Sequence, residues 1–512
     1  MGDSRTKNTS RNIAAGLVNR FSTILLTFIN RTIILYLLGA EFTGLNSLFT
    51  SILGVLSIAE LGFDVAIIQS MYKPIAEGDQ NRVCELLTLY RKAYYIVGVT
   101  IFAIGILLIP FLPLLINGDV PKSVNLYVLY IMYLMNSVIS YFMYAYKESL
   151  LLAHQRRDIS HLIRTVFLTV KQIAQAVVLI AFKEFYAYLL MEIIFTILTN
   201  IWIAKETNRR YPEYQPIPGK RVKMSDDIKK QLKGLVVGNV CDRARNSLDS
   251  IVLSAFLGLT TVAIYNNYYY IYSAIYGTML VICNSMGASV GNSIVTETVE
   301  KNYENLNKFS FIAAWLSGWL AICMLCVYQP FMELWAGREL MLSDFNMMLF
   351  CLYFYAINMN NIRNQYISGT GIWWEIRNSN IAEAIANIVL NIVLGKLFGI
   401  TGIIAATIIT IVLFNFLWRT IVLFRTYFKN MSLNEFLMNH LYWFLCTAFA
   451  AAVSWKICGM IKMGAVGSLF ANGVICLIVP NIILFLLYFK TKQFGNMKIF
   501  AKTFLLKIKN HR

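Results

Sequence analysis

Long apolar runs, separated by short polar and mostly basic segments, make up nearly the whole chain. Runs of about 18 or more apolar residues are long enough to cross a bilayer as helices. The pattern predicts an all-α integral membrane fold of about fourteen transmembrane helices. The predicted helices are 12–38, 43–71, 93–116, 126–146, 159–182, 185–204, 233–258, 261–288, 309–328, 343–366, 380–397, 402–424, 441–458 and 466–488.

One predicted helix, 233–258, carries polar side chains along a single face. Asn239, Asp242, Asn246 and Asp249 lie three or four positions apart, which is the spacing of one helical face. A charge at the centre of a bilayer costs at least about 2.5 kcal/mol, so such residues normally face a polar cavity or a partner. We therefore expect this face to border a cavity.

The first predicted helix carries a similar face 219 residues earlier, formed by Arg20, Thr23, Thr27 and Asn30. At the same offset two pairs of glycines align, Gly39 with Gly258 and Gly118 with Gly337. The recurring offset predicts an internal duplication. We expect two pseudo-symmetric six-helix lobes, followed by two helices without a counterpart in the first half.

The longest polar insertion separates the two predicted lobes. It contains three prolines and a run of basic residues, as a linker outside the membrane would. The predicted domains are an N-terminal six-helix lobe (1–204), a cytoplasmic linker (205–232), a C-terminal six-helix lobe (233–430), two additional transmembrane helices (431–489) and a basic cytoplasmic tail (490–512).

Charge sets the expected orientation. The 512 residues are 58% hydrophobic and 14% charged, with a net charge of +18. Most of the basic residues lie between apolar runs, in alternate loops and at the two ends of the chain. This distribution fits loops that face anionic headgroups on the inner leaflet, and it argues against nucleic acid as a partner. We predict a multi-pass plasma-membrane protein with both termini in the cytoplasm.

Metal and cofactor chemistry has little support in the sequence. The four histidines show no ligand spacing, so no metal site is expected. Cys323 and Cys326 form a CxxC pair, but within a predicted membrane helix we interpret them as small buried residues. No cofactor is expected either.

Three stretches resemble a known superfamily. They are LGAEFTGLNSLFTSILGVLSIAELGFDVAI (38–67), PFMELWAGREL after the ninth predicted helix, and its shorter counterpart FLPLLINGD. These stretches are similar to Wzx-type polysaccharide flippases of the multidrug/oligosaccharidyl-lipid/polysaccharide exporter superfamily, which also holds MATE drug exporters and the lipid II flippase. The resemblance implies two six-helix lobes around a central cleft, and alternating access for a sugar chain carried on a polyprenyl diphosphate.

Five cations within the predicted helices are candidate substrate ligands. Guanidinium groups bind a diphosphate bidentately and never lose their charge. For each cation the alternative is snorkelling to the interface or pairing with a carboxylate. The candidates are Arg20, Arg31, Lys171, Arg243 and Arg245.

Three carboxylates are candidates for binding a coupling cation, namely Asp64, Asp242 and Asp249. Ion pairing with the neighbouring arginines is the simpler alternative. Arg363, near the inner end of its predicted helix, is expected to snorkel. A run of tyrosines suits either sugar stacking or placement at the membrane interface, and consists of Tyr265, Tyr268, Tyr269, Tyr270, Tyr272 and Tyr276.

These features together favour a flippase that moves a polyprenyl-diphosphate-linked oligosaccharide from the cytoplasmic to the outer face of the plasma membrane, for cell-surface polysaccharide synthesis. Its expected partners are the lipid-linked glycan, membrane lipids and other polysaccharide-assembly membrane proteins. One alternative is a cation-coupled drug exporter of the MATE type. The other is an integral-membrane polysaccharide polymerase, although the short predicted outer loops leave little room for catalytic residues.

Overall fold

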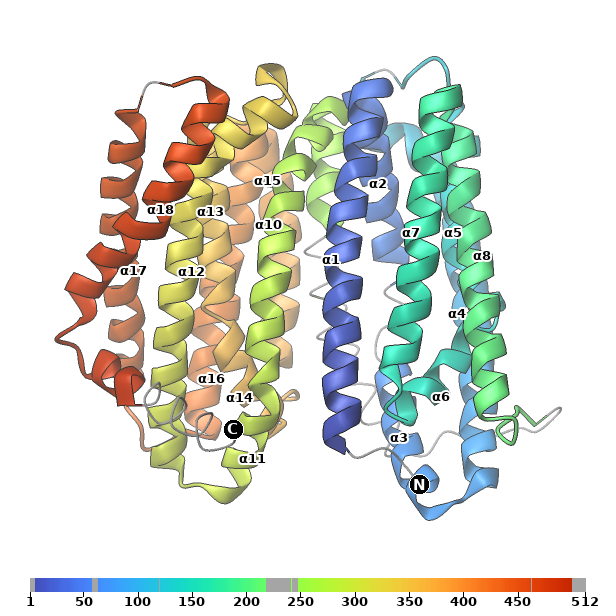
Figure 1. Cartoon of the computed structure of the whole chain (residues 1–512), viewed down its shortest axis with the longest axis horizontal. Coiled ribbons are helices and arrows are strands. Elements are labelled where there is room, and N and C mark those ends of the chain that lie inside the picture. Colours follow the sequence, from blue (N-terminus) through green and yellow to red (C-terminus); the bar gives the residue numbers. More distant parts are fainter. Residues whose placement is uncertain are drawn as a thin grey trace. The chain divides into compact units, whose positions relative to one another are not determined.

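The computed structural model describes residues 5–57, 63–118, 120–217, 241, 247–461 and 463–499. These residues form helices joined by turns and contain no strand, in agreement with the all-α prediction. They fall into two compact units, unit 1 (Met1–Ala263) and unit 2 (Ile264–Arg512). Figure 1 labels the helices, which are described below for each unit by itself.

Unit 1 contains eight labelled α-helices and a short helix near its end. Within it α1 packs along α7, and α7 along α8 (Figure 1). The helices are α1 (Arg5–Leu37), α2 (Ala40–Leu56), α3 (Phe63–Glu77), α4 (Gln80–Leu108), α5 (Leu126–Phe142), α6 (Glu148–Ala153), α7 (Arg157–Phe182), α8 (Phe185–Arg210) and Ser247–Leu257, with 3-10 turns at Ile109–Leu115 and Ala145–Lys147.

The start of α4 differs from the predicted helix 93–116. The Asp79 carboxylate caps the helix by accepting a hydrogen bond of 2.9 Å from the Arg82 backbone N–H, so α4 begins at Gln80. The stretch from Gln80 to residue 92 lies between the predicted helices 43–71 and 93–116, as part of a basic amphipathic connector. Its apolar positions are nevertheless helical in spacing, and Val83, Leu86, Leu87 and Tyr90 are buried. The stretch from Gln80 to residue 92 is therefore part of α4.

Unit 2 contains the remaining labelled helices. The predicted helices 441–458 and 466–488 correspond to α17 and α18, which pack against α12 and against each other. The helices are α10 (Leu259–Ser285), which begins in unit 1, α11 (Gly287–Thr296), α12 (Val299–Trp335), α13 (Asp344–Asn358), α14 (Asn361–Thr370), α15 (Arg377–Thr410), α16 (Arg419–Thr426), α17 (Leu433–Gly459) and α18 (Ala465–Tyr488), with a π-helix, η5, at Ile411–Trp418.

The stretch from α15 to α16 is a helical hairpin. Gly399 has φ 60° and ψ −134°, which breaks α15 between the predicted helices 380–397 and 402–424. Side chains far apart in sequence then meet across the hairpin, as Asn387 does with Thr410 at 3.4 Å. At Gly402 a Cβ would lie 1.9 Å from the Leu394 carbonyl oxygen, so only glycine fits this turn.

Backbone conformation repeats at the offset that the sequence suggested. Gly39 and Gly258 have φ values of 99° and 83°, and each lies next to the start of a helix. Gly118 and Gly337, again 219 residues apart, have φ values of 95° and 82°. Side chains other than glycine rarely adopt these angles. The two pairs support an internal duplication, whereas the predicted domain boundaries remain predictions.

Nine described helices are long and apolar enough to cross a bilayer, or ten if the bent pair Leu126–Phe142 and Ala145–Ala153 forms one span. The hairpin at Arg377–Thr426 counts as one of the nine, although its 50 residues are far longer than one crossing needs. The chain is thus a multi-pass membrane protein. The figure of fourteen helices stays a prediction.

The predicted orientation can be tested by labelling single cysteines with a membrane-impermeant maleimide from outside the cell. We expect labelling at Asn117→Cys and Gly337→Cys, and none at Pro216→Cys or Lys498→Cys. Labelling of the native cysteines should be low, because eight of them are buried and Cys323 is half-buried. External labelling at position 216 would contradict the orientation.

Gly44 allows a close approach within unit 1. A Cβ at this position would lie 2.2 Å from the Leu259 carbonyl oxygen, so α2 and the first turn of α10 would have to separate. We expect Gly44→Ala to lower the free energy of unfolding by about 1–3 kcal/mol, as overpacking does. Thermal unfolding in detergent measures this. Gly473→Ala on α18 is the matched control, since a Cβ there meets nothing within 4 Å, and equal effects of the two changes would contradict the prediction.

Candidate functional site

Unit 1 holds a polar cavity of about 580 Å³. Its walls come mainly from α1, α5, α7 and α8, four helices of the membrane-spanning unit. Two ion pairs and several amide and hydroxyl side chains line it, which is unusual for helices otherwise suited to lipid. This cavity is the candidate functional site.

The first ion pair joins α7 to α8 across the cavity wall. Lys171 Nζ lies 2.7 Å from Glu192 Oε1, and the two side chains are 16% and 27% exposed. Gln175, one turn further along α7, donates from Nε2 to Glu192 Oε2 at 2.9 Å. The lysine that the sequence singled out therefore does line a cavity and also has an acidic partner, so both alternatives stated for it hold.

The second ion pair joins α7 to α6. Arg164 donates from Nη2 to Glu148 Oε2 at 2.5 Å and from Nε to Oε1 at 3.2 Å, a bidentate arrangement. Arg164 lies seven residues before Lys171, two turns along the same face of α7. Its side chain is 46% exposed, so water reaches this pair. The two cations thus form a stripe along one wall of the cavity.

Uncharged hydrogen-bonding groups cover the facing surfaces of α5 and α8. Thr196 donates to Asn136 Oδ1 at 2.8 Å, and Asn200 Nδ2 donates to Ser140 Oγ at 3.1 Å. On α8, Glu192, Thr196 and Asn200 are each four residues apart, which places them on one helical face. Groups of this kind bind sugar hydroxyls through the same donor and acceptor geometry.

The helix α1 supplies Asn19 and Thr23 to the cavity. Arg20 is half-buried on α1 and is not among the lining residues. Arg31 also lies outside the cavity, and donates from Nη1 to Ser47 Oγ of α2 at 3.5 Å. Between them, Asn30 is buried and donates from Nδ2 to the Gln172 carbonyl oxygen at 2.9 Å. The structure thus does not bring Arg20, Arg31 and Lys171 into one cavity.

The remaining sequence candidates are mostly beyond the described part. Asp242, Arg243 and Arg245 lie outside the described residues. For Asp64 the structure gives the backbone, which belongs to α3, but not the side chain. Asp249 is described, and is 4% exposed on the helix Ser247–Leu257. The substrate and coupling roles of these residues remain predictions.

Sequence reasoning missed most of the cavity. Glu192, Thr196 and Asn200 form a polar stripe on the predicted helix 185–204, and their spacing is the same kind of signal as the polar face of 233–258. Arg164 lies near the start of the predicted helix 159–182, and Glu148 lies just before that helix, after the predicted helix 126–146. Their pairing depends on how α6 packs on α7, which no local pattern reveals.

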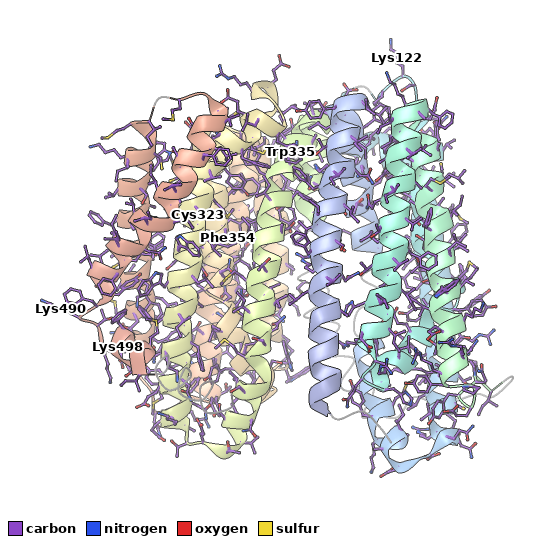
Figure 2. All side chains as sticks on the ribbon, in the orientation of Figure 1. Lys122, Cys323, Trp335, Phe354, Lys490 and Lys498 are labelled. Atoms are coloured by element: carbon purple, nitrogen blue, oxygen red, sulfur yellow. The ribbon has the colours of Figure 1, made fainter. Side chains whose placement is uncertain are left out.

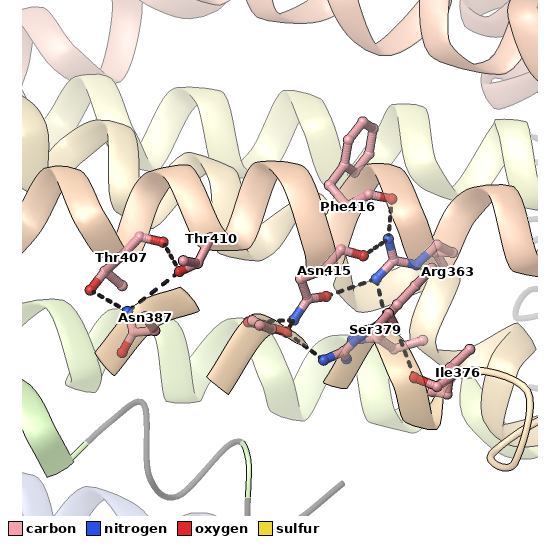
Figure 3. Close-up of polar contacts among 11 residues, drawn as sticks. Arg363, Ile376, Ser379, Asn387, Thr407, Thr410, Asn415 and Phe416 are labelled. Atoms are coloured by element: carbon pink, nitrogen blue, oxygen red, sulfur yellow. Dashed lines mark hydrogen bonds and ion pairs between the residues drawn. The ribbon is translucent and has the colours of Figure 1, made fainter. Parts of the chain in front are cut away.

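Unit 2 contains a second polar cluster, which is fully buried (Figure 3). Arg419 of α16 lies 2.6 Å from Glu383 of α15, with side chains 8% and 3% exposed. Arg363 of α14 donates to the carbonyl oxygens of Asn415 and Phe416 in η5, at 2.6 and 2.9 Å. The π-helix is a local departure from α-helical hydrogen bonding, of the kind found at functional sites and packing constraints.

The prediction that Arg363 snorkels is wrong, because this residue is 1% exposed. Its guanidinium is held by neutral oxygens, including Asn415 Oδ1 at 2.9 Å and Thr420 Oγ1 at 3.2 Å. Buried charges need such partners. Because these contacts join α14 to η5, we interpret the cluster as a structural network that holds α14 against the hairpin.

The tyrosine run of α10 packs mainly against α13. Tyr265, Tyr268 and Tyr272 are buried. Tyr272 stacks on Tyr353 with ring centroids 4.6 Å apart, and the Tyr268 hydroxyl donates to Gln329 Oε1 at 2.6 Å. For these three tyrosines, helix packing accounts for the aromatic character without a sugar.

Comparison with solved structures identifies the fold. Lipid II flippase MurJ, in an inward closed conformation, matches with a TM-score of 0.68 and 14% identity, covering 93% of this chain and 99% of that one. An inward-facing MATE family multidrug resistance transporter matches at 0.59 with 15% identity, covering 78% and 94%. A MOP superfamily transporter from Pyrococcus furiosus, described as having a binding pocket of reverse polarity, matches with a TM-score of 0.58 and 14% identity, covering 82% of this chain and 96% of that one.

The fold and the polar cavity thus define a membrane protein with the architecture shared by MurJ and MATE transporters. The family model described as "Polysaccharide biosynthesis protein" matches residues 9–288, which is more than half of the chain. The chain belongs to this family, as the resemblance found in the sequence implied. No curated protein sequence matches it.

Proposed function

We propose that this protein is a flippase for a polyprenyl-diphosphate-linked oligosaccharide, which it carries from the cytoplasmic to the outer face of the plasma membrane. The observation that carries the proposal is the polar, ion-paired cavity inside the membrane helices of a polysaccharide biosynthesis family member. A transporter, rather than an enzyme, is the class that this arrangement favours.

The physical requirement is a wet path for the headgroup. Sugar hydroxyls and phosphates lose their hydrogen bonds to water in hydrocarbon, at a cost of several kcal/mol for each group. Amide and hydroxyl side chains such as Asn136, Ser140, Thr196 and Asn200 replace those bonds. The polyprenyl tail needs no such replacement and stays in the lipid.

The cations supply the selectivity for a diphosphate. Lys171 and Arg164 are each held by a carboxylate in the cavity. An entering diphosphate competes with Glu192 and Glu148 for these cations, and charge-assisted hydrogen bonds to phosphate are among the strongest that side chains form. Each cation is thus paired with its carboxylate when the cavity is empty, and pairs with the diphosphate when the substrate enters.

The other predicted cations extend the proposal. Arg20, Arg31, Arg243 and Arg245 would serve as further phosphate ligands along the path of the headgroup. A membrane potential that is negative inside favours outward movement of negative charge by about 2.3 kcal/mol per charge per 100 mV. The potential would contribute to driving transport if the diphosphate crosses the field.

A cation-coupled exporter is the second candidate, because the same cavity contains two carboxylates, Glu148 and Glu192. In that case Glu192, Asp64, Asp242 or Asp249 would bind the coupling ion. If Glu192 is the coupling residue, neutralising it would abolish transport. The flippase proposal instead expects Glu192→Gln to retain transport, because it removes a competitor of the diphosphate.

Native mass spectrometry of the purified protein tests the proposal. We expect adducts whose masses match polyprenyl-linked glycans, and we expect Lys171→Ala to lose them. Lys183→Ala, at the exposed turn between α7 and α8, is the matched control and should keep them. Adducts that are only phospholipid in the unsubstituted protein would contradict the proposed substrate.

A further inference from the structure

Three cysteines from three different helices converge inside unit 2. The Sγ atoms of Cys326 on α12, Cys458 on α17 and Cys476 on α18 all lie within 4.8 Å of one another. Their residues are 3%, 5% and 1% exposed. None of the three takes part in the candidate site, which belongs to unit 1.

The cluster is not the CxxC pair of the sequence. Cys323, labelled in Figure 2 on α12, lies one turn before Cys326, and its thiol points to the Cys476 carbonyl oxygen at 3.8 Å. Specific contacts fix the backbone around the cluster instead. Asn472 donates to the Cys326 carbonyl oxygen at 2.9 Å, and Trp319 donates to that of Cys476 at 2.8 Å. The three helices are therefore held in register at the level of the sulfurs.

We propose that Cys326, Cys458 and Cys476 form a three-coordinate binding site for a soft d¹⁰ cation, with Cu⁺ as the representative ion. Thiolate ligands select Cu⁺ and Zn²⁺ over harder ions. Zn²⁺ in structural sites takes four ligands, whereas Cu⁺ is satisfied by three sulfurs in a plane. The described residues place three sulfurs at this point and no nitrogen or carboxylate ligand with them.

The geometry needs only a small adjustment. With metal–sulfur bonds of about 2.3 Å, as for zinc, three sulfurs in a plane around one ion stand about 4 Å apart. The present limit of 4.8 Å therefore has to contract by less than about 1 Å, within reach of cysteine rotamer adjustment. No displacement of α12, α17 or α18 is required.

The charge of the complex limits how many of the three cysteines are deprotonated. Binding of Cu⁺ by two thiolates and one thiol releases two protons and leaves a single negative charge, so one Cu⁺ and three thiols give one anionic complex and two H⁺. Three thiolates would leave two negative charges in a buried site, at greater desolvation cost. The buried cluster thus favours the form that keeps one thiol.

A cavity of about 220 Å³ gives access to the cluster. Cys326 and Cys458 line it, together with Met347, Asp344 and Asn472. A thioether and a carboxylate are groups that an incoming cation meets favourably before it reaches the thiols. Because α17 and α18 are the two helices without a counterpart in the duplication, the ion would fasten them to α12 of the duplicated core.

The test uses the full-length, reduced protein in detergent, titrated with Cu⁺ in competition with a chromophoric Cu⁺ chelator. We expect one ion per chain and a sulfur-to-copper charge-transfer band in the near ultraviolet. Each of Cys326→Ser, Cys458→Ser and Cys476→Ser should weaken binding by more than about 100-fold, exceeding what loss of a partner outside the ligand set costs. Cys446→Ser is the matched control, since Cys446 is buried on α17 three turns from Cys458.

X-ray absorption of the copper-loaded, unsubstituted protein needs no variant and so does not depend on how the serine variants fold. We expect three sulfur scatterers around copper. The proposal is overturned if the unsubstituted protein binds no Cu⁺, if Cys446→Ser binds as weakly as the cluster variants, or if Zn²⁺ competes equally well. The site is independent of the proposed transport function, so neither result decides the other.

Discussion

Replacing Lys171 with alanine is expected to abolish export of the lipid-linked oligosaccharide. Lys171 is the cavity cation held by Glu192 at 2.7 Å, and its loss leaves that carboxylate facing the diphosphate. Removing one member of a partly buried, hydrogen-bonded charge pair costs binding about 2–4 kcal/mol, or about 30- to 1,000-fold in affinity. Transport by membrane vesicles containing equal amounts of protein measures the loss.

Two further variants distinguish the cause. Lys171→Arg keeps the charge and should retain part of the transport, while the double change Lys171→Ala with Glu192→Gln should recover some of it, because the repelling carboxylate is gone. Lys183→Ala should be neutral, since that residue is exposed at the turn after α7. Full transport by Lys171→Ala would show that the cavity cation does not contact the substrate.

Replacing Arg419 with alanine is expected to lower the free energy of unfolding by about 3–5 kcal/mol, because the buried Glu383 carboxylate loses the guanidinium that lies 2.6 Å from it. The two side chains are 8% and 3% exposed, so water cannot take over the lost contact. The Asn415 amide remains near the carboxylate, at 3.3 and 3.4 Å, but it carries no charge. Thermal unfolding of the purified protein, with abundance in the membrane, measures the effect.

The control removes both charges together. Arg419→Met with Glu383→Gln leaves no unpaired charge, and should recover most of the stability lost by Arg419→Ala. If Arg419→Ala lowered the free energy of unfolding no more than the double change does, loss of the ion pair would not explain the effect of Arg419→Ala. Per folded molecule, the same variants should transport as much as the unsubstituted protein, since none of the substituted residues lines the cavity of unit 1.

Much of the fold follows from local patterns. The predicted helices 159–182 and 466–488 agree with α7 and α18 within two residues, because each is a continuous apolar run between polar ends. The break at Gly399 was likewise predictable, since Gly399 and Thr401 lie between the two predicted helices there. The glycines with positive φ support the offset of 219, because only glycine takes that conformation without strain.

The site was harder to predict, because its residues come from separate helices. Lys171 was found because a lysine in an apolar run is expensive and therefore conspicuous. Glu148 and Arg164 were not, since they lie near helix ends where charges are ordinary. For Arg363 the position near a helix end was misleading, because it suggested snorkelling. The residue is instead buried, and carbonyl oxygens of η5 accept hydrogen bonds from its guanidinium. Convergence of Cys326, Cys458 and Cys476 depends wholly on packing.

One measurement tests the central claim most directly. The purified protein is reconstituted into vesicles that contain a polyprenyl-diphosphate oligosaccharide with a fluorescent headgroup, and a membrane-impermeant reductant destroys the label that it can reach. If the protein is the proposed flippase, label in the inner leaflet becomes accessible, while vesicles with Lys171→Ala keep it protected. Continued protection of the inner-leaflet label by folded, unsubstituted protein would contradict the account.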